Sequence, residues 1–191
     1  MTYRRERGVT LIELLIAMAI LAIVSGLTIS SWAAFVERNK HRRIVLTYHQ
    51  AFEYARWKAA SSKNLVTVCP LGKGSTCIDD WNLPVSVFPD ANNDKKPDSG
   101  QVWRRVDPPA KPYSVKSRTA KRGYLQFSSS GMTHGGSGGL VLCPSQPSAG
   151  RKISYMAVNK GGRFRSQSVD SHIGSIKLKW GALIECPHTS S

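Results

Sequence analysis

The stretch GVTLIELL (residues 8–15) decides the fold of this chain, within the N-terminal segment MTYRRERGVTLIELLIAMAILAIVSGLTISSWAAFV (residues 1–36). A short basic leader precedes it, and the 28 residues from Val9 to Val36 contain a single charge, Glu13. As a helix these residues would be about 42 Å long, which is enough to cross a bilayer. Because basic flanks stay on the cytoplasmic side, the rest of the chain is expected to face outwards.

Glu13 is the anomaly of this segment, because a carboxylate inside an apolar helix costs several kcal/mol unless it has a partner. A basic leader followed by GVTLIELL resembles the class III signal of type IV pilins and pseudopilins. The resemblance implies that a prepilin peptidase cuts after Gly8 and methylates Val9, where the family more often has Phe. It also implies that Glu13 pairs with the free amine of a neighbouring subunit in a filament. The alternative is a plain single-span membrane anchor.

An apolar stripe continues the helical pattern beyond the first segment. It recurs every three or four residues through Val45, Tyr48, Phe52, Ala55 and Ala59, which predicts a helix to about Ser62 packed under a sheet. Four basic residues precede the stripe and are interpreted as interfacial anchors or a solvated collar, with a secondary share in ligand binding: Arg38, Lys40, Arg42 and Arg43.

From Asn64 onwards, short alternating runs separated by Gly, Pro, Asn and Ser predict strands. The fold class is therefore α+β, with one long N-terminal hydrophobic helix packed on an antiparallel β-sheet head. We divide the chain into a leader peptide (1–8), a transmembrane or filament-core helix (9–36), its amphipathic second half (37–62) and a β-rich periplasmic head (63–191).

The four cysteines are spaced unlike the usual zinc sites, and an even number in an exported chain favours two disulfides. Three pairings are possible from sequence, and we favour Cys69–Cys77 and Cys143–Cys186. The pairing places the head in an oxidising compartment.

Charge in this chain is strongly unbalanced, with 27 Lys and Arg against 12 Asp and Glu, a formal net charge of +15. Residues 108–169 contain ten basic side chains and no acidic one. Such a balance indicates a polyanionic partner, such as nucleic acid or anionic lipid, although a basic surface can also serve solubility alone.

The stretch KGGRFRSQS (residues 160–168) lies inside the acid-free run and follows a predicted strand. Asn159 to Gly162 predict a hairpin turn, and the period of the next strand points Arg163 and Arg165 to one face and Phe164 to the core. Arginines about 6.6 Å apart can each take a phosphate, and Gly161 and Gly162 would let a sugar–phosphate backbone approach. Three further basic residues are expected as second contacts: Lys160, Arg151 and Lys152. The alternative is a solvated edge strand.

The order of these segments resembles the GspH/FimT family of minor pilins and pseudopilins. The motif Gly162-Arg163-Phe164-Arg165 favours the FimT branch, which is implicated in binding DNA during natural transformation. The resemblance implies a minor type IV pilin, held in the bacterial inner membrane before assembly, whose periplasmic head binds double-stranded DNA without sequence preference. Its other partners would be prepilin peptidase and further pilins. The alternatives are a structural pseudopilin of pilus assembly or type II secretion, and an adhesin for acidic polysaccharide.

Nothing in the sequence argues for an enzyme, a cofactor or a metal. The segment from Asp90 to Asp98 resembles half of an EF-hand loop, but Lys95 replaces the required glycine, so we interpret it as a polar hairpin turn. The segment Gly135 to Gly139 satisfies a nucleophile-elbow pattern with no helix after it, and we interpret it as a loop.

Overall fold

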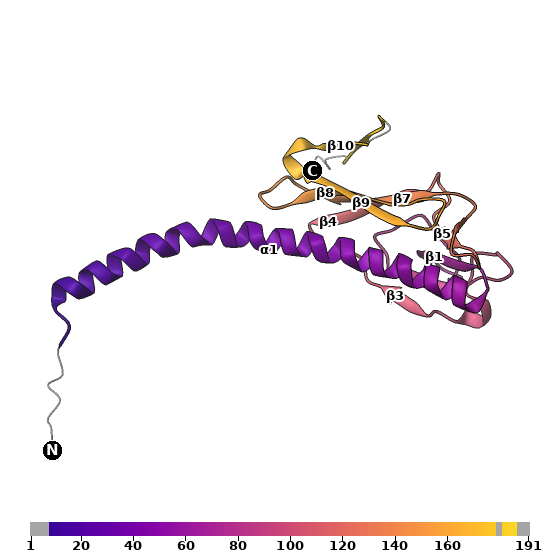
Figure 1. Ribbon diagram of the computed structural model, residues 1–191, viewed down its shortest axis with the longest axis horizontal. Coiled ribbons are helices and arrows are strands. Elements are labelled where there is room, and N and C mark those ends of the chain that lie inside the picture. The colour runs from indigo at the N-terminus through magenta and orange to yellow at the C-terminus, as the bar shows by residue number, and fades with distance from the viewer. Residues whose placement is uncertain (1–7, 179–180, 187–191) are drawn as a thin grey trace, which may run out of the picture.

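A computed structural model describes residues 8–178 and 181–186 of the chain, with the side chains of residues 26–31 excepted. Its first element is α1, a helix of 52 residues over Leu11–Ser62, about 78 Å long at 1.5 Å per residue. The helix is gently curved, its N-terminal half projects away from the head, and its C-terminal half packs along the head (Figure 1). Except for Gly8, the predicted leader lies outside the described residues.

Side chains and backbone geometry define both ends of α1. Thr10 is the N-cap residue, and its hydroxyl accepts from the Glu13 amide at 3.3 Å while the Glu13 carboxylate accepts from the Thr10 amide at 3.4 Å. This capping box satisfies two amides that a helix start leaves without partners. At the other end Lys63 takes the left-handed conformation, with φ of 57°, and the helix ends at Ser62, as the sequence predicts.

The two halves of α1 differ in burial. Tyr48, Phe52, Ala55 and Ala59 are buried, as the stripe predicts, and they pack in the main core against strands of the head. Outside the head, the apolar side chains from Leu11 to Val24 are more than half exposed where they are described. Within the described part of the chain, we find no helix that meets the length and apolarity needed to cross a membrane.

The strands form two antiparallel sheets and a two-stranded ribbon. The five-stranded sheet has the order β3-β2-β1-β5-β6, formed by β1 (Val66–Pro70), β2 (Val85–Pro89), β3 (Arg104–Val106), β5 (Leu125–Phe127) and β6 (Thr133–His134). The four-stranded sheet has the order β4-β7-β8-β9, formed by β4 (Tyr113–Arg118), β7 (Gly138–Pro144), β8 (Lys152–Val158) and β9 (Phe164–Asp170). The ribbon pairs β10 (Ser175–Lys177) with β11 (Leu183–Glu185). Two short 3₁₀ turns, Asp98–Gly100 and Ser171–Ile173, complete the elements.

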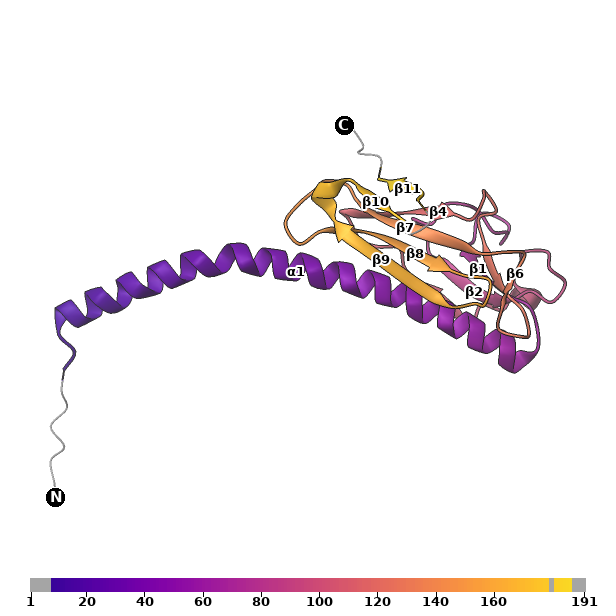
Figure 2. The same cartoon turned by 45° about the horizontal axis from the view of Figure 1, so that its top comes forward.

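This arrangement confirms the predicted α+β class, with the helix packed on an antiparallel head. The strands are divided between two sheets, however, where the sequence suggested one. The helix runs beneath both sheets, and β9 lies alongside it (Figure 2). The ribbon covers the second face of the four-stranded sheet, because Ile176 and Ile184 cluster with Val141 and Ile153.

Gly138 and Gly139 correct the sequence-based expectation of a loop over residues 135–139, since both begin β7. A Cβ atom on Gly138 would lie 2.7 Å from Leu125 Cδ2, and one on Gly139 would lie 2.7 Å from the Met156 carbonyl oxygen. These glycines therefore allow β7 to pass close to β5 and to the adjacent strand β8.

Both predicted disulfides are present in the structure. Cys69 in β1 is bonded to Cys77 with a Cα–Cα distance of 5.5 Å, and Cys143 in β7 is bonded to Cys186 with a distance of 5.6 Å. The second bond ties the C-terminal ribbon to the four-stranded sheet.

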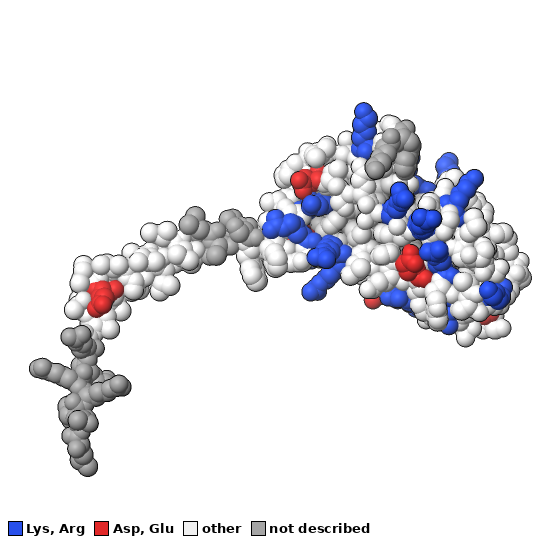
Figure 3. Space-filling view, in the orientation of Figure 1, with Lys and Arg blue, Asp and Glu red and all other residues white. Residues whose placement is uncertain are grey.

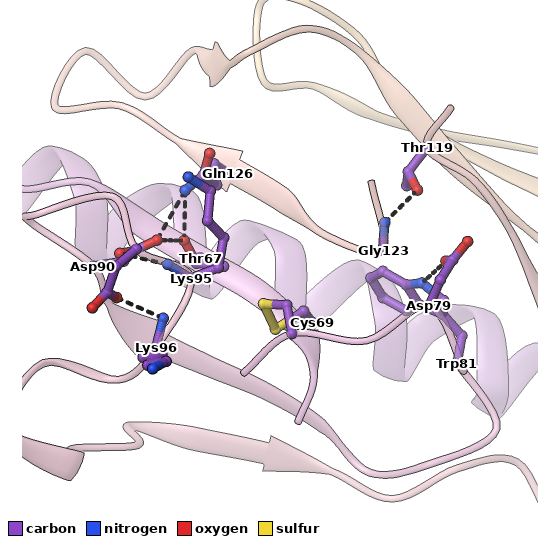
Figure 4. Close-up of a disulfide and its surroundings, with 12 residues drawn as sticks. Thr67, Cys69, Asp79, Trp81, Asp90, Lys95, Lys96, Thr119, Gly123 and Gln126 are labelled. Atoms are coloured by element: carbon purple, nitrogen blue, oxygen red, sulfur yellow. Dashed lines mark hydrogen bonds between the residues drawn. A yellow bond between two sulfur atoms is a disulfide. The ribbon is translucent and has the colours of Figure 1, made fainter. Parts of the chain in front are cut away.

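A buried polar network lies beside the first disulfide (Figure 4). The carboxylate of Asp90 accepts hydrogen bonds from Thr67 Oγ1 at 2.5 Å and Gln126 Nε2 at 2.9 Å, and its other oxygen accepts from the Lys95 amide at 3.2 Å. The residues after Asp90 connect the antiparallel pair β2 and β3, which confirms the hairpin interpretation. Asp90 thus joins two strands to a loop.

Candidate nucleic-acid interface

Asn159, the first residue of the turn between β8 and β9, stabilises this hairpin through two hydrogen bonds. The ladder ends at the pair Val158 and Phe164, which leaves residues 159–163 in the turn. The Asn159 carbonyl accepts from the Gly162 amide at 2.9 Å, and the Asn159 side-chain oxygen accepts from the Arg163 amide at 2.9 Å. The Lys160 carbonyl accepts from the Thr133 amide at 3.0 Å, which tethers the turn to β6. The hairpin is therefore fixed on both sides of its tip.

Gly162 has a different role from the one that the sequence suggested. Its φ is +73°, and a Cβ atom there would lie 2.1 Å from the Gly131 carbonyl oxygen. That same carbonyl accepts from Arg56 Nε at 3.0 Å. Gly162 is buried against the protein's own backbone, so its missing side chain makes room for the turn at Gly131 and not for a ligand.

The three residues after Gly162 alternate in exposure, as predicted. Phe164 is half buried and stacks on His49, with ring centroids 4.7 Å apart, and on Phe52, with centroids 5.9 Å apart. Arg163 and Arg165 are exposed. Phe164 thus anchors the start of β9 on the helix, while the neighbouring guanidinium groups extend into solvent.

Arg163, Arg165 and Lys160 carry uncompensated charge. Within the described part of the chain, none of the three forms an ion pair with an acidic side chain. Strand β9 is further held by the C-terminal ribbon, because Gln167 Nε2 donates to the Lys177 carbonyl at 3.1 Å. The arrangement presents positive charge on a supported strand at the edge of its sheet.

Arg151 and Lys152 lie at the other end of the same pair of strands. Lys152 pairs in register with Asp170, whereas the hairpin end of the ladder is the pair of Val158 and Phe164. The two pairs are six residues apart along β8, a distance of about 20 Å. The structure therefore does not bring these two residues together with the hairpin tip. It places them at the opposite end of the β8–β9 pair.

Arg151 is engaged with the helix. Its Nε donates to Glu37 Oε2 at 3.0 Å, and both side chains are largely buried. Burial alone would raise the pKa of Glu37, but the hydrogen bonds and charges of Arg151 and Lys40 outweigh it and hold that pKa below its ordinary value. Lys152 is less constrained, with its Nζ 4.0 Å from Asp170.

A groove of about 600 Å³ separates α1 from β9. Sequence reasoning missed it because its walls come from segments more than a hundred residues apart. The lining residues from the helix are Arg38, His41, Arg42, Val45, Leu46 and His49. Those from the sheet are Lys152, Phe164, Arg165, Ser166 and Ser168. Four of these residues are Arg or Lys, and none is acidic.

His41 forms part of the lining where the helix meets the sheet. Its Nε2 lies 2.6 Å from Ser154 Oγ, which lies 2.7 Å from Ser168 Oγ. Burial, and secondarily the charge of Lys152, lowers the pKa of His41 to about 4. The imidazole of His41 is therefore neutral at physiological pH and adds no positive charge to the groove.

Basic side chains are spread over the visible face of the head and gather where the helix enters it, whereas acidic side chains there are few (Figure 3). Among the described residues, no group of three His, Cys, Asp or Glu side chains could hold a metal ion. The chemistry available at this surface is the recognition of anions.

Comparison with known proteins identifies the family. Residues 47–162 match the family model described as type II transport protein GspH, which is more than half of the chain. This chain belongs to the GspH family. Residues 3–29 match the prokaryotic N-terminal methylation motif. The GspH match ends at Gly162, so Arg163 and Arg165 lie just beyond it.

A solved structure shares the fold of this GspH-family chain. The crystal structure of the type IV minor pilin FimU of Pseudomonas aeruginosa matches at 18% identity with a TM-score of 0.55, over 70% of this chain and 92% of that one. The minor pseudopilin EpsH from the type 2 secretion system of Vibrio cholerae matches at 13% identity with a lower TM-score of 0.47, over 68% of this chain and 97% of that one. A search of curated proteins gave no significant match.

Proposed function

We propose that this chain is a minor pilin whose head binds DNA without sequence preference and supports DNA uptake in natural transformation, as in the FimT branch. Before assembly, residues 9–36 hold it at the bacterial inner membrane with the head in the periplasm. A prepilin peptidase removes the leader after Gly8 and methylates Val9, and other pilins are its filament partners. The methylation motif, the GspH family and the two disulfides support this assignment.

The observation that carries DNA binding is the pair Arg163 and Arg165. Both are exposed on a hairpin that Asn159 and Phe164 hold in place, and neither forms an ion pair with the described acidic residues. Phosphates are the ligand for such a pair, because a guanidinium gives short charge-assisted hydrogen bonds to phosphate oxygens. Lys160 adds charge at the tip, and Arg151 and Lys152 are secondary contacts at the far end of the β8–β9 pair. Contacts to phosphate carry no sequence information, so binding should be sequence-tolerant and salt-dependent.

The test measures binding of a short DNA duplex to the full chain in a non-ionic detergent, by fluorescence anisotropy over a series of salt concentrations. Arg163→Ala with Arg165→Ala should weaken binding at low salt by about tenfold or more and reduce the slope of log K against log salt by about two. The matched control is Arg104→Ala with Arg105→Ala, which removes two arginines of β3 that line a separate cleft. An unchanged affinity in the hairpin variant would place the DNA site elsewhere.

A structural role without DNA binding is the second candidate, favoured by the family description as a type II transport protein. The basic surface would then dock on an acidic sister subunit. This candidate predicts that the wild-type chain does not retain DNA at moderate salt in the same experiment.

A further inference from the structure

We propose that the groove between α1 and β9 holds the sugar–phosphate backbone of one strand of the bound DNA, with Arg38 and Arg42 as contacts on the helix. This inference rests on the DNA-binding function proposed above and extends it from the hairpin tip to the helix. Neither the sequence motif nor the family match assigns a binding role to these two arginines.

Three contacts show that α1 runs alongside β9, so the groove between them is elongated, and we call it the track. Near the hairpin, His49 stacks on Phe164; midway, His41 contacts Ser154, which is bonded to Ser168; at the far end, Glu37 binds Arg151. The helix from residue 37 to residue 49 therefore lies beside the strand from its end to its start. This stretch of helix is about 18 Å long, close to the length of the strand.

The cations are placed along this track and not around one point. Arg165 pairs in register with Ala157, five residues along β8 from Lys152, so the two basic positions are about 17 Å apart along the strands. Because five is an odd number, their side chains leave opposite faces of the sheet, and Arg165 reaches the groove from the free edge of β9. On the opposite wall, Arg38 and Arg42 are one helical turn apart on the same face. One strand of DNA carries a phosphate for about every 3.4 Å of helix axis, so an array of this length can meet several phosphates of one strand. A single small anion would use only part of it.

The helical arginines are free to bind. Arg38 and Arg42 are exposed, and neither forms an ion pair with an acidic residue in the described ranges. The nearest acid on their side of the helix, Glu37, is already bound by Lys40 and Arg151. Any phosphate in the groove therefore meets guanidinium groups that no carboxylate has neutralised.

Neutral donors complete the groove. Ser166 and Ser168 line it from β9, and hydroxyl groups commonly donate to phosphate oxygens in complexes with nucleic acids. Strand β9 is the edge of its sheet, and three of its residues that line the groove, Arg165, Ser166 and Ser168, are exposed to solvent. A backbone can thus enter from the side and continue towards Arg163 at the hairpin.

The experiment compares Arg38→Ala with Arg42→Ala against the matched pair Arg104→Ala with Arg105→Ala, on the full chain in non-ionic detergent with the same duplex and salt series. Both pairs remove two arginines, but only the first lines the groove. The groove variant should weaken DNA binding about tenfold at low salt and reduce the salt slope by about two, while the control keeps the wild-type slope. Circular dichroism melting should show both variants folded, because alanine is favourable in an exposed helix position and neither Arg104 nor Arg105 is buried.

The outcomes separate this inference from the proposed function. Suppose that the Arg163 and Arg165 variant loses DNA binding while the groove variant binds like the control. The groove then does not contact DNA, and the proposed site at the hairpin is retained. If wild type does not bind DNA, both proposals fail. Loss of binding to monomeric short-chain phosphatidylglycerol in the groove variant, with unchanged DNA affinity, would assign the groove to a lipid headgroup and overturn the inference.

Discussion

At the scale of single residues, the motif Gly162-Arg163-Phe164-Arg165 combines two tasks. Arg163 and Arg165 are exposed and chemically available, whereas Gly162 and Phe164 are used to build the hairpin. Gly162 is needed because its φ is positive and because the Gly131 carbonyl occupies the space of a side chain. A loss of DNA binding on mutation of Gly162 would therefore report on the hairpin and not on a ligand contact.

Gly161 provides the control for the interpretation that Gly162 is needed to form the hairpin. Gly162→Ala should lower the free energy of unfolding by about 2–4 kcal/mol, because the left-handed conformation costs an alanine about 1–2 kcal/mol and the clash adds a similar amount. Gly161→Ala should change it by less than about 1 kcal/mol, since a Cβ atom there meets only Asn159 Oδ1 at 3.5 Å. Urea unfolding of both variants gives the two values. Equal destabilisation would show that the close approach to Gly131 does not constrain the turn.

The alternation of Arg163, Phe164 and Arg165 could be predicted from the sequence because a strand has a period of two residues. The close contact at Gly162 could not, since Gly131 is 31 residues away and nothing in either segment specifies their approach. The same limit applies to Arg151, whose partner Glu37 lies on the helix. Local periodicity determines which way a side chain points, and tertiary contacts determine what it meets.

At the scale of elements, the packing of α1 against the four-stranded sheet determines the site. His41 is buried at this interface and lies within hydrogen-bonding distance of Ser154, and its neutral form is favoured. The pKa of His41 is about 4 in the folded state, against an ordinary histidine value of 6.5 that applies to the unfolded chain. Below about pH 6.5 His41 is protonated in the unfolded state but stays neutral in the folded state. The free energy of unfolding therefore decreases as the pH falls towards about 4.

This linkage predicts that burial of His41 makes the free energy of unfolding decrease in acid. Between pH 7 and pH 5, wild type should lose about 2 kcal/mol more of its free energy of unfolding than His41→Gln, which cannot be protonated. Urea unfolding at the two pH values measures the difference. The control is His172→Gln, which removes an exposed imidazole in place of the buried one. A wild-type pH dependence identical to that of His41→Gln would show that burial of His41 does not oppose its protonation.

The elements themselves could be predicted more fully than their arrangement. The apolar stripe from Tyr48 to Ala59 predicted the buried helix face, because helical spacing is local. The division into two sheets was not predicted, since a strand pattern does not specify its partners. The groove was missed for the same reason. The sequence indicates that Arg38 and Arg42 are interfacial anchors or a collar with a secondary share in ligand binding, and only the docking of β9 beside them places Arg165 in the same groove.

At the scale of the whole molecule, α1 belongs to two environments. Its C-terminal half packs against the sheets of the head through a buried face, while the large apolar side chains of its N-terminal half are exposed in the single chain. Such a surface is expected to be covered by other helices or by lipid. Glu13 stands at the start of this half, where its carboxylate caps its own helix through Thr10. It therefore has a local role in addition to the predicted pairing with a neighbouring subunit.

Two substitutions of Glu13 separate these roles. Glu13→Ala removes both the charge and the capping box, whereas Glu13→Gln removes the charge and keeps a side chain that completes a capping box. If pairing with a neighbour's amine drives assembly, both variants should enter filaments at least about tenfold less, since breaking a buried ion pair costs about 3–5 kcal/mol. The measurement is the fraction of the chain recovered with filaments sheared from cells. DNA binding by both variants should stay at the wild-type level, because Glu13 lies in the half of α1 that projects from the head (Figure 1). Normal assembly by Glu13→Gln alone would show that Glu13 acts by capping its own helix, and the neighbouring amine would then not be its partner.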